Sequence, residues 1–228
     1  MKLVLATHNR DKVGEIRGIL SGLDVSLLTL DDFPGAPVPA EDGETLEANA
    51  LVKARAIRAF TDLSALADDT GLEVDALEGA PGVRAARFAG EGASYAQNRA
   101  RLLEALAGVP EEKRTARFRC VIALALGAAE RERVARALAA APDRDFGARI
   151  DPALGVDALV GEGAMGGRIT TAESGSGGFG YDAVFYDPGA GRTLAQMTAA
   201  EKNARSHRYR GLIELRALML ELGLVEEA

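Results

Sequence analysis

The sequence predicts an α/β protein in which helices flank a central sheet. Three observations predict this class. Short apolar runs alternate with segments of helical spacing, one longer run alternates apolar and polar residues as a strand does, and the last segment carries an apolar stripe typical of a helix packed on a sheet. The chain has 228 residues, of which 47% are hydrophobic. This length is enough for one large α/β domain or for two small lobes that share a cleft.

The first strand is expected at residues 3–6, and a polar turn and a helix follow it directly. After the turn, apolar residues such as Val13, Ile16 and Leu20 recur at helical spacing. Asn9 can accept hydrogen bonds from the first amides of this helix. Because a helix N-terminus carries partial positive charge, the turn is a natural place for a phosphate. The apolar run before it is too short for a signal peptide or a membrane span.

A helix opened by Thr45 leads to the second strand, residues 63–67, which runs straight into Asp68-Asp69-Thr70. We interpret these three residues as an acidic turn at the carboxyl end of a strand, where open α/β sheets form ligand crevices. Hard divalent cations bind such carboxylates, but a structural turn uses the same residue types, so the local sequence leaves both interpretations open. The segment just upstream offers a further carboxylate for the same metal, from Glu41, Asp42, Glu44 or Glu47.

The middle of the chain alternates helices and strands up to an unusual segment. A capping box at residues 94–97 begins a helix that should end at Gly108, and residues 115–126 alternate as one long strand. Residues 127–160 then contain an exposed helix of mixed charge and a stretch rich in Pro and Asp. We interpret this segment as an insertion.

The last third contains a glycine-rich segment and two helices. Eight glycines stand between Gly161 and Gly180, which predicts turns around one short strand at residues 167–170. A second capping box at residues 198–201 begins a short helix, and an apolar stripe after Ser206 predicts a C-terminal helix.

Two segments of this last third have the composition of a base-binding site. Residues 177–182 place two aromatics and an acid among glycines, and an aromatic can stack on a base while a carboxylate accepts from a purine N–H. Residues 201–208 hold three cations and one of the two histidines of the chain. By themselves, these segments also fit a β-turn with core aromatics and a solvated charged surface.

Composition excludes several classes of protein and site. A net charge of −7 argues against a protein that coats nucleic acid, because such proteins carry broad positive faces. The single cysteine, Cys120, excludes an internal disulfide framework and a multi-cysteine zinc site, and it fits a cytoplasmic protein. The chain has neither a P-loop sequence nor a nucleophile elbow.

Six blocks stand in a fixed order along the chain and extend over nearly all of it outside residues 127–160. They are Ala6-Thr7-His8-Asn9 with Lys12, Asp68-Asp69-Thr70-Gly71-Leu72 with Val74-Asp75-Ala76-Leu77, Gly79-Ala80-Pro81-Gly82-Val83, Ala86-Arg87-Phe88-Ala89-Gly90, Gly177-Gly178-Phe179-Gly180-Tyr181-Asp182, and Glu201-Lys202-Asn203 with Ser206-His207-Arg208. Together these blocks resemble the inosine/xanthosine triphosphate pyrophosphatases, which remove noncanonical purine nucleotides.

The resemblance implies a single domain over residues 1–228, with a mixed, twisted central sheet and two lobes that enclose a nucleotide cleft. It implies a homodimer that uses Mg²⁺ to hydrolyse ITP, dITP and XTP to the monophosphate and pyrophosphate. From the net charge and the short apolar run, we expect no nucleic-acid or membrane partner. A metal-bound water would attack the α-phosphorus, and no covalent intermediate would form.

The resemblance also implies a role for each matching residue. Asp69 would bind metal and act as the general base, with Asp68 and Glu41 as further metal ligands. Thr70 would contact the substrate. The phosphate-binding segment would be Thr7, His8, Asn9, Arg10, Asp11 and Lys12, and the nucleobase pocket would consist of Phe179, Gly180, Tyr181, Asp182, Lys202, His207 and Arg208. A 6-oxo purine presents an acceptor that Lys or Arg can satisfy, whereas adenine presents a donor.

Four features depart from the pattern of the family. His8 stands where glycine is usual, Ala183 replaces a proline and Gln196 replaces a glutamate. Residues 127–160 are about twenty residues longer than the family requires, which fits one extra helical excursion. Two alternative functions remain open, a pyrophosphatase for modified pyrimidine nucleotides and a nucleotide sensor without catalysis.

Overall fold

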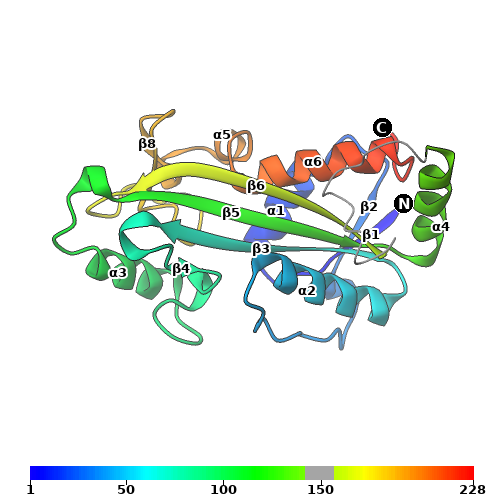
Figure 1. Ribbon diagram of the computed structural model, residues 1–228, viewed down its shortest axis with the longest axis horizontal. Coiled ribbons are helices and arrows are strands. Elements are labelled where there is room, and N and C mark those ends of the chain that lie inside the picture. The colour runs from blue at the N-terminus through cyan, green and yellow to red at the C-terminus, as the bar shows by residue number, and fades with distance from the viewer. Residues whose placement is uncertain (142–156) are drawn as a thin grey trace. The chain divides into compact units, whose positions relative to one another are not determined.

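The sheet of this protein is mixed, with parallel pairing at one end of its strand order and antiparallel pairing at the other. The computed structural model describes residues 1–141 and 157–228. Its strands follow the order β2-β1-β3-β5-β6-β7-β8, with β4 paired to β3 (Figure 1). Strand β1 pairs in parallel with β2 and β3, whereas β7 pairs antiparallel with β6 and β8. The strands are β1 Lys2–Leu5, β2 Ser26–Thr29, β3 Ser64–Val74, β4 Pro81–Gly82, β5 Thr115–Ala125, β6 Ala158–Ile169, β7 Phe185–Asp187 and β8 Arg192–Thr193.

The helices begin where the sequence predicts them, which confirms the α/β class. The side chains of Asn9, Thr45, Ser94 and Thr198 each accept a hydrogen bond from a backbone amide of the helix that follows. None of the described helices combines the length and the apolar character that a membrane crossing requires. The helices are α1 Arg10–Leu20, α2 Leu46–Thr61, α3 Tyr95–Ala105, α4 Ala128–Ala140, α5 Ala199–Asn203 and α6 His207–Glu221.

The chain divides into two compact units. Unit 1 comprises Met1–Asp69, Val121–Glu162 and Arg208–Ala228, and unit 2 comprises Thr70–Cys120 and Gly163–His207. The long strands β3, β5 and β6 each contribute residues to both units. Asp69 and Thr70 are therefore adjacent residues that belong to different units, as are His207 and Arg208.

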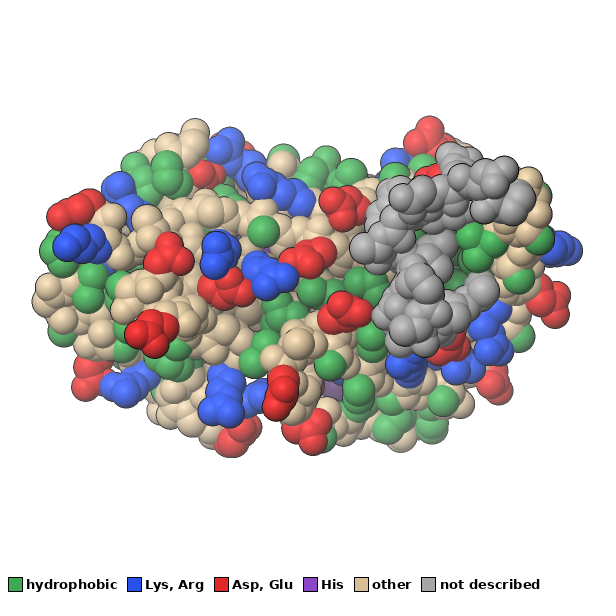
Figure 2. All heavy atoms as spheres, in the orientation of Figure 1, with side chains coloured by type: hydrophobic (Ala, Val, Ile, Leu, Met, Phe, Trp, Pro, Cys, Tyr) green, Lys and Arg blue, Asp and Glu red, His purple; other side chains and the backbone are tan. Residues whose placement is uncertain are grey.

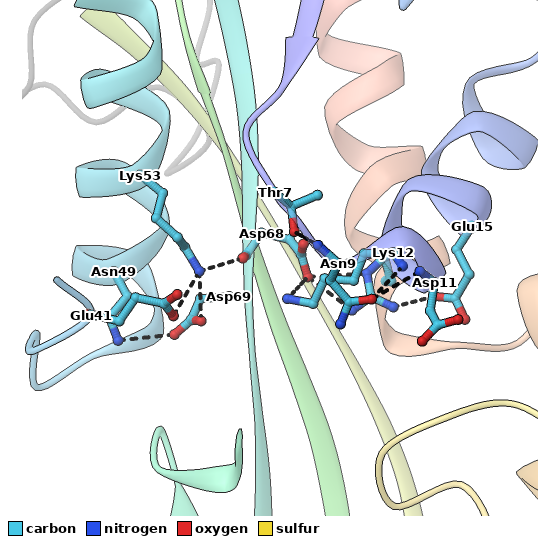
Figure 3. A network of polar contacts seen from close by, with 11 residues as sticks. Thr7, Asn9, Asp11, Lys12, Glu15, Glu41, Asn49, Lys53, Asp68 and Asp69 are labelled. Carbon is cyan, nitrogen blue, oxygen red and sulfur yellow. Dashed lines mark hydrogen bonds and ion pairs between the residues drawn. The ribbon is translucent and has the colours of Figure 1, made fainter. Parts of the chain in front are cut away.

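Unit 1 is built on the parallel strands. In β1, Leu3, Val4 and Leu5 are all fully buried, as expected for a parallel strand that is covered on both faces. Helix α2 lies on one side of β3, and α1 and α6 lie on the other side (Figures 1 and 3). Their apolar faces, including Ile16, Ile57 and Leu215, complete the core.

Unit 2 has a separate core in which β5 packs on α3 and β7. The alternation predicted for residues 115–126 is confirmed over the first half of β5, where Ala116 and Phe118 are buried while Arg117 is exposed. The ring centroids of Phe118 and Phe185 lie 4.5 Å apart. From Cys120 onward every residue of β5 is buried, so the alternation ends where both faces of the strand are covered.

The prediction of turns around one short strand in the glycine-rich segment is partly wrong, because β6 is longer and extends from Ala158 to Ile169. Two of its glycines lie where neighbouring groups approach the strand closely. A Cβ atom at Gly161 would lie 2.5 Å from the carbonyl oxygen of Gly211, and one at Gly167 would lie 2.5 Å from the ring of Phe185. Positions 161 and 167 of β6 are therefore glycines because neighbouring groups approach the backbone too closely for a side chain.

The predicted insertion at residues 127–160 is described only in part. Helix α4 is the charged helix that the sequence predicts, and of its side chains only Val134 is buried. The stretch rich in Pro and Asp falls on residues 142–156, which lie outside the described residues.

On the face drawn in Figure 2, Lys and Arg side chains alternate with Asp and Glu and form no continuous basic surface.

Candidate functional site

The acidic pair Asp68-Asp69 lies inside a strand. The prediction of a turn at Asp68-Asp69-Thr70 is wrong, because β3 runs without a break from Ser64 to Val74. Successive side chains of a strand point to opposite faces. Asp69 accordingly points toward α2, while Asp68 points toward α1 (Figure 3). The two carboxylates therefore belong to two different groups of side chains.

On the α2 face, Asp69 is held by Lys53 and Asn49. Lys53 Nζ lies 3.0 Å from Asp69 Oδ1 and donates to the backbone oxygen of Asp68 at 2.9 Å. Asn49 Nδ2 donates to Asp69 Oδ2 at 3.1 Å. Since Asn49 and Lys53 are four residues apart on α2, they lie on the same face of the helix. Both oxygens of Asp69 are thus fixed by one helix.

Glu41 joins this group from the loop before α2. Lys53 Nζ donates to Glu41 Oε2 at 3.1 Å. The loop is anchored by Asn49, whose Oδ1 accepts from the backbone N–H of Gly43 at 2.8 Å. A Cβ atom at Gly43 would lie only 2.6 Å from that oxygen, so the contact requires glycine. We call Glu41, Asn49, Lys53 and Asp69 the Asp69 cluster.

The two carboxylates of the Asp69 cluster have opposite pKa shifts. Burial raises the pKa of Asp69, although Lys53 and Lys12 oppose the shift. Burial also disfavours the charge of Glu41, but Lys53 outweighs it, with smaller contributions from Lys12 and Asp69, and lowers the pKa of Glu41. When two carboxyls share one cation, one ionises more easily than the other. The cluster therefore combines an ionised Glu41 with an Asp69 whose proton affinity is increased.

Lys53 retains its charge despite its burial. Burial alone would lower the pKa of Lys53, but Asp69, Asp68 and Glu41 reverse the effect and raise it. Lys53 therefore supplies a fixed positive charge between the two carboxylates.

On the other face of β3, Asp68 is surrounded by cations. Lys12 Nζ of α1 lies 3.0 Å from Asp68 Oδ2. The Nη2 atom of Arg208 donates to the same oxygen at 2.9 Å. Arg208 is only 1% exposed and also pairs with Glu15 of α1. We call Lys12, Glu15, Asp68 and Arg208 the Asp68 cluster.

The charge of Asp68 is permanent. Burial disfavours the carboxylate, but Lys12, Arg208 and Lys53 outweigh it and hold the pKa of Asp68 far below its usual range. A buried carboxylate with several cationic partners is an electrostatic anchor, and such a group does not exchange protons near neutral pH.

The predicted phosphate-binding segment, residues 7–12, forms the turn between β1 and α1. Thr7 Oγ1 accepts from the backbone N–H of Asn9 at 3.1 Å. Asn9 Oδ1 in turn accepts from the amides of Asp11 and Lys12, at 3.0 and 3.3 Å (Figure 3). Thr7, Asn9 and Lys12 are partly buried, whereas His8, Arg10 and Asp11 are exposed. The segment thus brings Lys12, in the first turn of α1, to the carboxylate of Asp68.

The predicted base-binding residues come together in unit 2 around a buried ion pair. Lys202 Nζ lies 2.6 Å from Asp182 Oδ2, which also accepts from the backbone N–H of Phe179 at 2.8 Å. The same ammonium lies 4.3 Å from the centroid of the Phe179 ring. At Gly178, where φ is +68°, a Cβ atom would lie 2.1 Å from Asp182 Oδ2. The absence of a side chain at Gly178 therefore leaves room for the Asp182 carboxylate to accept from the N–H of Phe179.

The other predicted residues of unit 2 contribute to its core or its strands. His207 is buried and stacks on Phe118, with ring centroids 4.7 Å apart. Tyr181 donates its hydroxyl to the carbonyl oxygen of Ala85 at 2.7 Å, and burial raises its pKa. Gly180 accepts a hydrogen bond from Arg99 through its carbonyl oxygen. Thr70 is partly buried on β3, next to Asp69.

The structure groups the predicted residues differently from the sequence interpretation. Glu41 and Asp69 share Lys53, whereas Asp68 lies on the opposite face. Arg208 contacts Asp68 and Glu15 in unit 1, while Lys202 and His207 belong to unit 2.

Three polar residues of the two clusters are absent from the prediction. Asn49 and Lys53 are two polar residues on the apolar face of α2, four positions apart. This spacing could have indicated that they act together. Glu15 gave no such signal, because a charged residue on a helix is usually solvated.

The residues of the Asp69 cluster fit a magnesium ion. Mg²⁺ is usually bound by one or two carboxylates together with waters and substrate phosphates. Glu41 and Asp69 supply two carboxylates around a single cationic group, that of Lys53. Within residues 1–141 and 157–228, no group of three or more His, Cys, Asp or Glu side chains is placed to hold a metal. Waters and the phosphates of a substrate would therefore have to provide the remaining ligands.

Comparison with known proteins confirms the resemblance inferred from the sequence. Residues 3–218 match the family model described as the Ham1 family. A "dITP/XTP pyrophosphatase" of Geobacter sulfurreducens is 43% identical over 215 residues, which are 94% of each chain. A protein of the same name from Desulforamulus reducens is 42% identical over 227 residues and the full length of both chains. A solved HAM1 protein from Coxiella burnetii superposes with a TM-score of 0.78 at 35% identity, over 97% of this chain and 99% of the other.

Proposed function

This chain belongs to the Ham1 family, and we propose that it hydrolyses noncanonical purine nucleoside triphosphates, among them dITP, ITP and XTP, to the monophosphate and pyrophosphate. The Asp69 cluster supports this proposal best, because it joins a carboxylate of raised pKa, a second carboxylate and a lysine. Relatives more than 40% identical along nearly their whole length are named as dITP/XTP pyrophosphatases.

We propose Asp69 as the general base. Burial raises its pKa toward neutrality, which suits a group that takes a proton from water during the reaction. Asn49 and Lys53 hold both of its oxygens, so the carboxylate is oriented before substrate arrives. Glu41 stays ionised beside it and balances the positive charge of Lys53.

Glu41 and Asp69 are the residues we propose to hold Mg²⁺. When bound, the ion would neutralise phosphate charge and lower the pKa of a water molecule. Asp68, which the resemblance also assigned to the metal, lies on the other face of β3, where Lys12 and Arg208 both contact its Oδ2. We therefore propose that Asp68 supports Lys12 and that Lys12 contacts the phosphates, together with Thr7 and Asn9. Arg208 would act through Asp68.

The base would be recognised in unit 2. Phe179 offers a ring for stacking, and the Lys202 and Asp182 pair offers a donor and an acceptor. A 6-oxo purine satisfies a lysine donor, whereas the exocyclic amine of adenine leaves that donor without an acceptor. His207 and Tyr181 are buried in the unit, where they contact Phe118 and the carbonyl oxygen of Ala85. Thr70, next to Asp69 on β3, would contact the substrate.

We further propose a homodimer and a cytoplasmic location for this chain. The homodimer comes from the resemblance to the family, and the location comes from the single cysteine, which fits a reducing compartment. The mass of the protein in solution, measured by light scattering, tests the dimer.

A panel of nucleoside triphosphates tests the proposed function. Pyrophosphate release is measured with and without Mg²⁺ for ITP, dITP, XTP, ATP, GTP, dUTP and a methylated pyrimidine triphosphate. We expect fast release only from ITP, dITP and XTP, and only with Mg²⁺. These three are the 6-oxo purine substrates of the panel that lack a 2-amino group. Faster release from a pyrimidine would favour the pyrimidine pyrophosphatase. Tight binding of ITP without release would favour the sensor.

A further inference from the structure

One face of α3 contacts residues 173–180 of unit 2, the segment that carries Phe179. Arg99 Nη1 donates to the carbonyl oxygen of Gly180 at 2.9 Å, and Arg99 Nε forms an ion pair with Glu173 Oε1 at 2.9 Å. Tyr95 lies one turn earlier on the same face of the helix. Its ring centroid is 6.0 Å from that of Phe179, with an angle of 38° between the two rings.

The segment that carries Phe179 is held mainly by groups outside it, among them Asp182 at the Phe179 N–H and Lys202 over the ring. Gly175, Gly178 and Gly180 all have positive φ values, and glycine loses more backbone freedom on ordering than any other residue. Phe179 is only partly buried. On the far side of the segment, the backbone N–H of Gly177 donates to the carbonyl oxygen of Ala195 at 2.9 Å. The position of the Phe179 ring therefore depends on groups outside the segment.

We propose that Tyr95 and Arg99 are positioning residues that fix Phe179 for stacking on the purine base and so determine the affinity for substrate. This inference rests on the proposed function. Arg99 restrains the backbone through a hydrogen bond from a charged donor, which is stronger than a neutral one. Tyr95 supports the ring of Phe179 by an aromatic contact. A ring that is already in place costs less conformational entropy when the base binds.

The proposal predicts a specific kinetic signature. The groups proposed for the chemistry, Asp69, Glu41 and Lys53, belong to unit 1, whereas Tyr95 and Arg99 belong to unit 2. Loss of a contact that serves ground state and transition state equally raises KM and leaves kcat unchanged. A loss of stability alone would instead lower the amount of active enzyme and leave KM unchanged.

Arg99→Met and Tyr95→Ala test the two contacts in the full-length protein with ITP as substrate. Arg101→Met is a matched control, because Arg101 lies on the same helix, is half exposed and forms an ion pair with Glu104 of the same helix. We expect KM to rise about tenfold in Arg99→Met and about threefold in Tyr95→Ala, with kcat within about twofold of the unchanged protein. Tyr95→Phe keeps the ring and should behave as the unchanged protein. A fall in kcat without a rise in KM would overturn the proposal.

Hydrogen exchange provides a second measurement that does not depend on catalysis. Arg99→Met should speed amide exchange in residues 173–182 at least tenfold and leave β1 unchanged, whereas Arg101→Met should change neither. Equal exchange in Arg99→Met and the unchanged protein would overturn the proposal whatever the activity. If no purine triphosphate is hydrolysed, the proposed function fails, and the role in base stacking fails with it, whereas faster exchange would still identify Arg99 as the support of the segment.

Discussion

Asp68 and Asp69 are neighbours in sequence, yet they have opposite electrostatic environments on the two faces of β3. Asp68 has three cations around it and a pKa far below the usual range, whereas burial raises the pKa of Asp69. The difference arises because successive side chains of a strand point to opposite faces of the sheet. Asp68 points to the face covered by α1 and α6, and Asp69 points to the face covered by α2. One dipeptide thus supplies an anchor of constant charge and a carboxylate able to exchange protons.

The largest expected effect is on catalysis, at Asp69. Asp69→Asn should lower kcat/KM for ITP by about a thousandfold, because the amide cannot accept the proton of the attacking water. Its free energy of unfolding should change by less than about 1 kcal/mol, since Lys53 keeps Glu41 and the backbone oxygen of Asp68 as partners. Pyrophosphate release and urea denaturation measure the two quantities. Asp62→Asn, at an exposed helix end, is the control and should leave both unchanged.

Asp68→Asn should show the reverse pattern. Removal of one member of a buried charge network leaves Lys12 and Arg208 without the Asp68 carboxylate that they share, so the free energy of unfolding should fall by about 3 kcal/mol. Urea denaturation monitored by circular dichroism measures this loss. A loss below about 1 kcal/mol together with a collapse of kcat would assign the catalytic role to Asp68 and reverse the comparison.

Lys53→Met tests the cation that links the two carboxylates of the Asp69 cluster. Without Lys53, the pKa of Asp69 should rise further, because the charge that opposes the effect of burial is lost. We expect kcat to fall about thirtyfold near neutral pH, and the acid limb of the pH profile to move to higher pH. Lys113→Met, at an exposed position of unit 2, serves as the control. An unchanged pH profile would contradict the assignment.

The smallest effect is the dependence of stability on pH. The pKa of Asp68 is lowered in the folded protein, so its stabilising contribution is complete above its unfolded pKa, about 3.9, and is lost as pH falls below that value. The difference in unfolding free energy between the unchanged protein and Asp68→Asn should therefore be constant from pH 7 to 5. Below pH 4 it should shrink by about 1.4 kcal/mol per pH unit. A constant difference down to pH 3 would contradict the lowered pKa.

The sequence by itself determined the local elements and the family. The first three helix caps, at Asn9, Thr45 and Ser94, depend on hydrogen bonds between residues two or three positions apart. Such bonds form from sequence spacing alone, so the starts of α1, α2 and α3 were predictable. The same is true of the acidic pair and of the ordered blocks that identify the Ham1 family, because these are properties of residue type and order.

Only the tertiary structure decided which side chains meet. Arg208 and Asp68 lie 140 positions apart and contact each other through the packing of α6 on β3. The prediction of turns at Asp68-Asp69-Thr70 and in the glycine-rich segment failed for the same reason. A strand that contains acids or glycines is stable only when neighbouring elements supply cations or require close approach, as Lys53 and Gly211 do here. Local sequence carries no information about those neighbours.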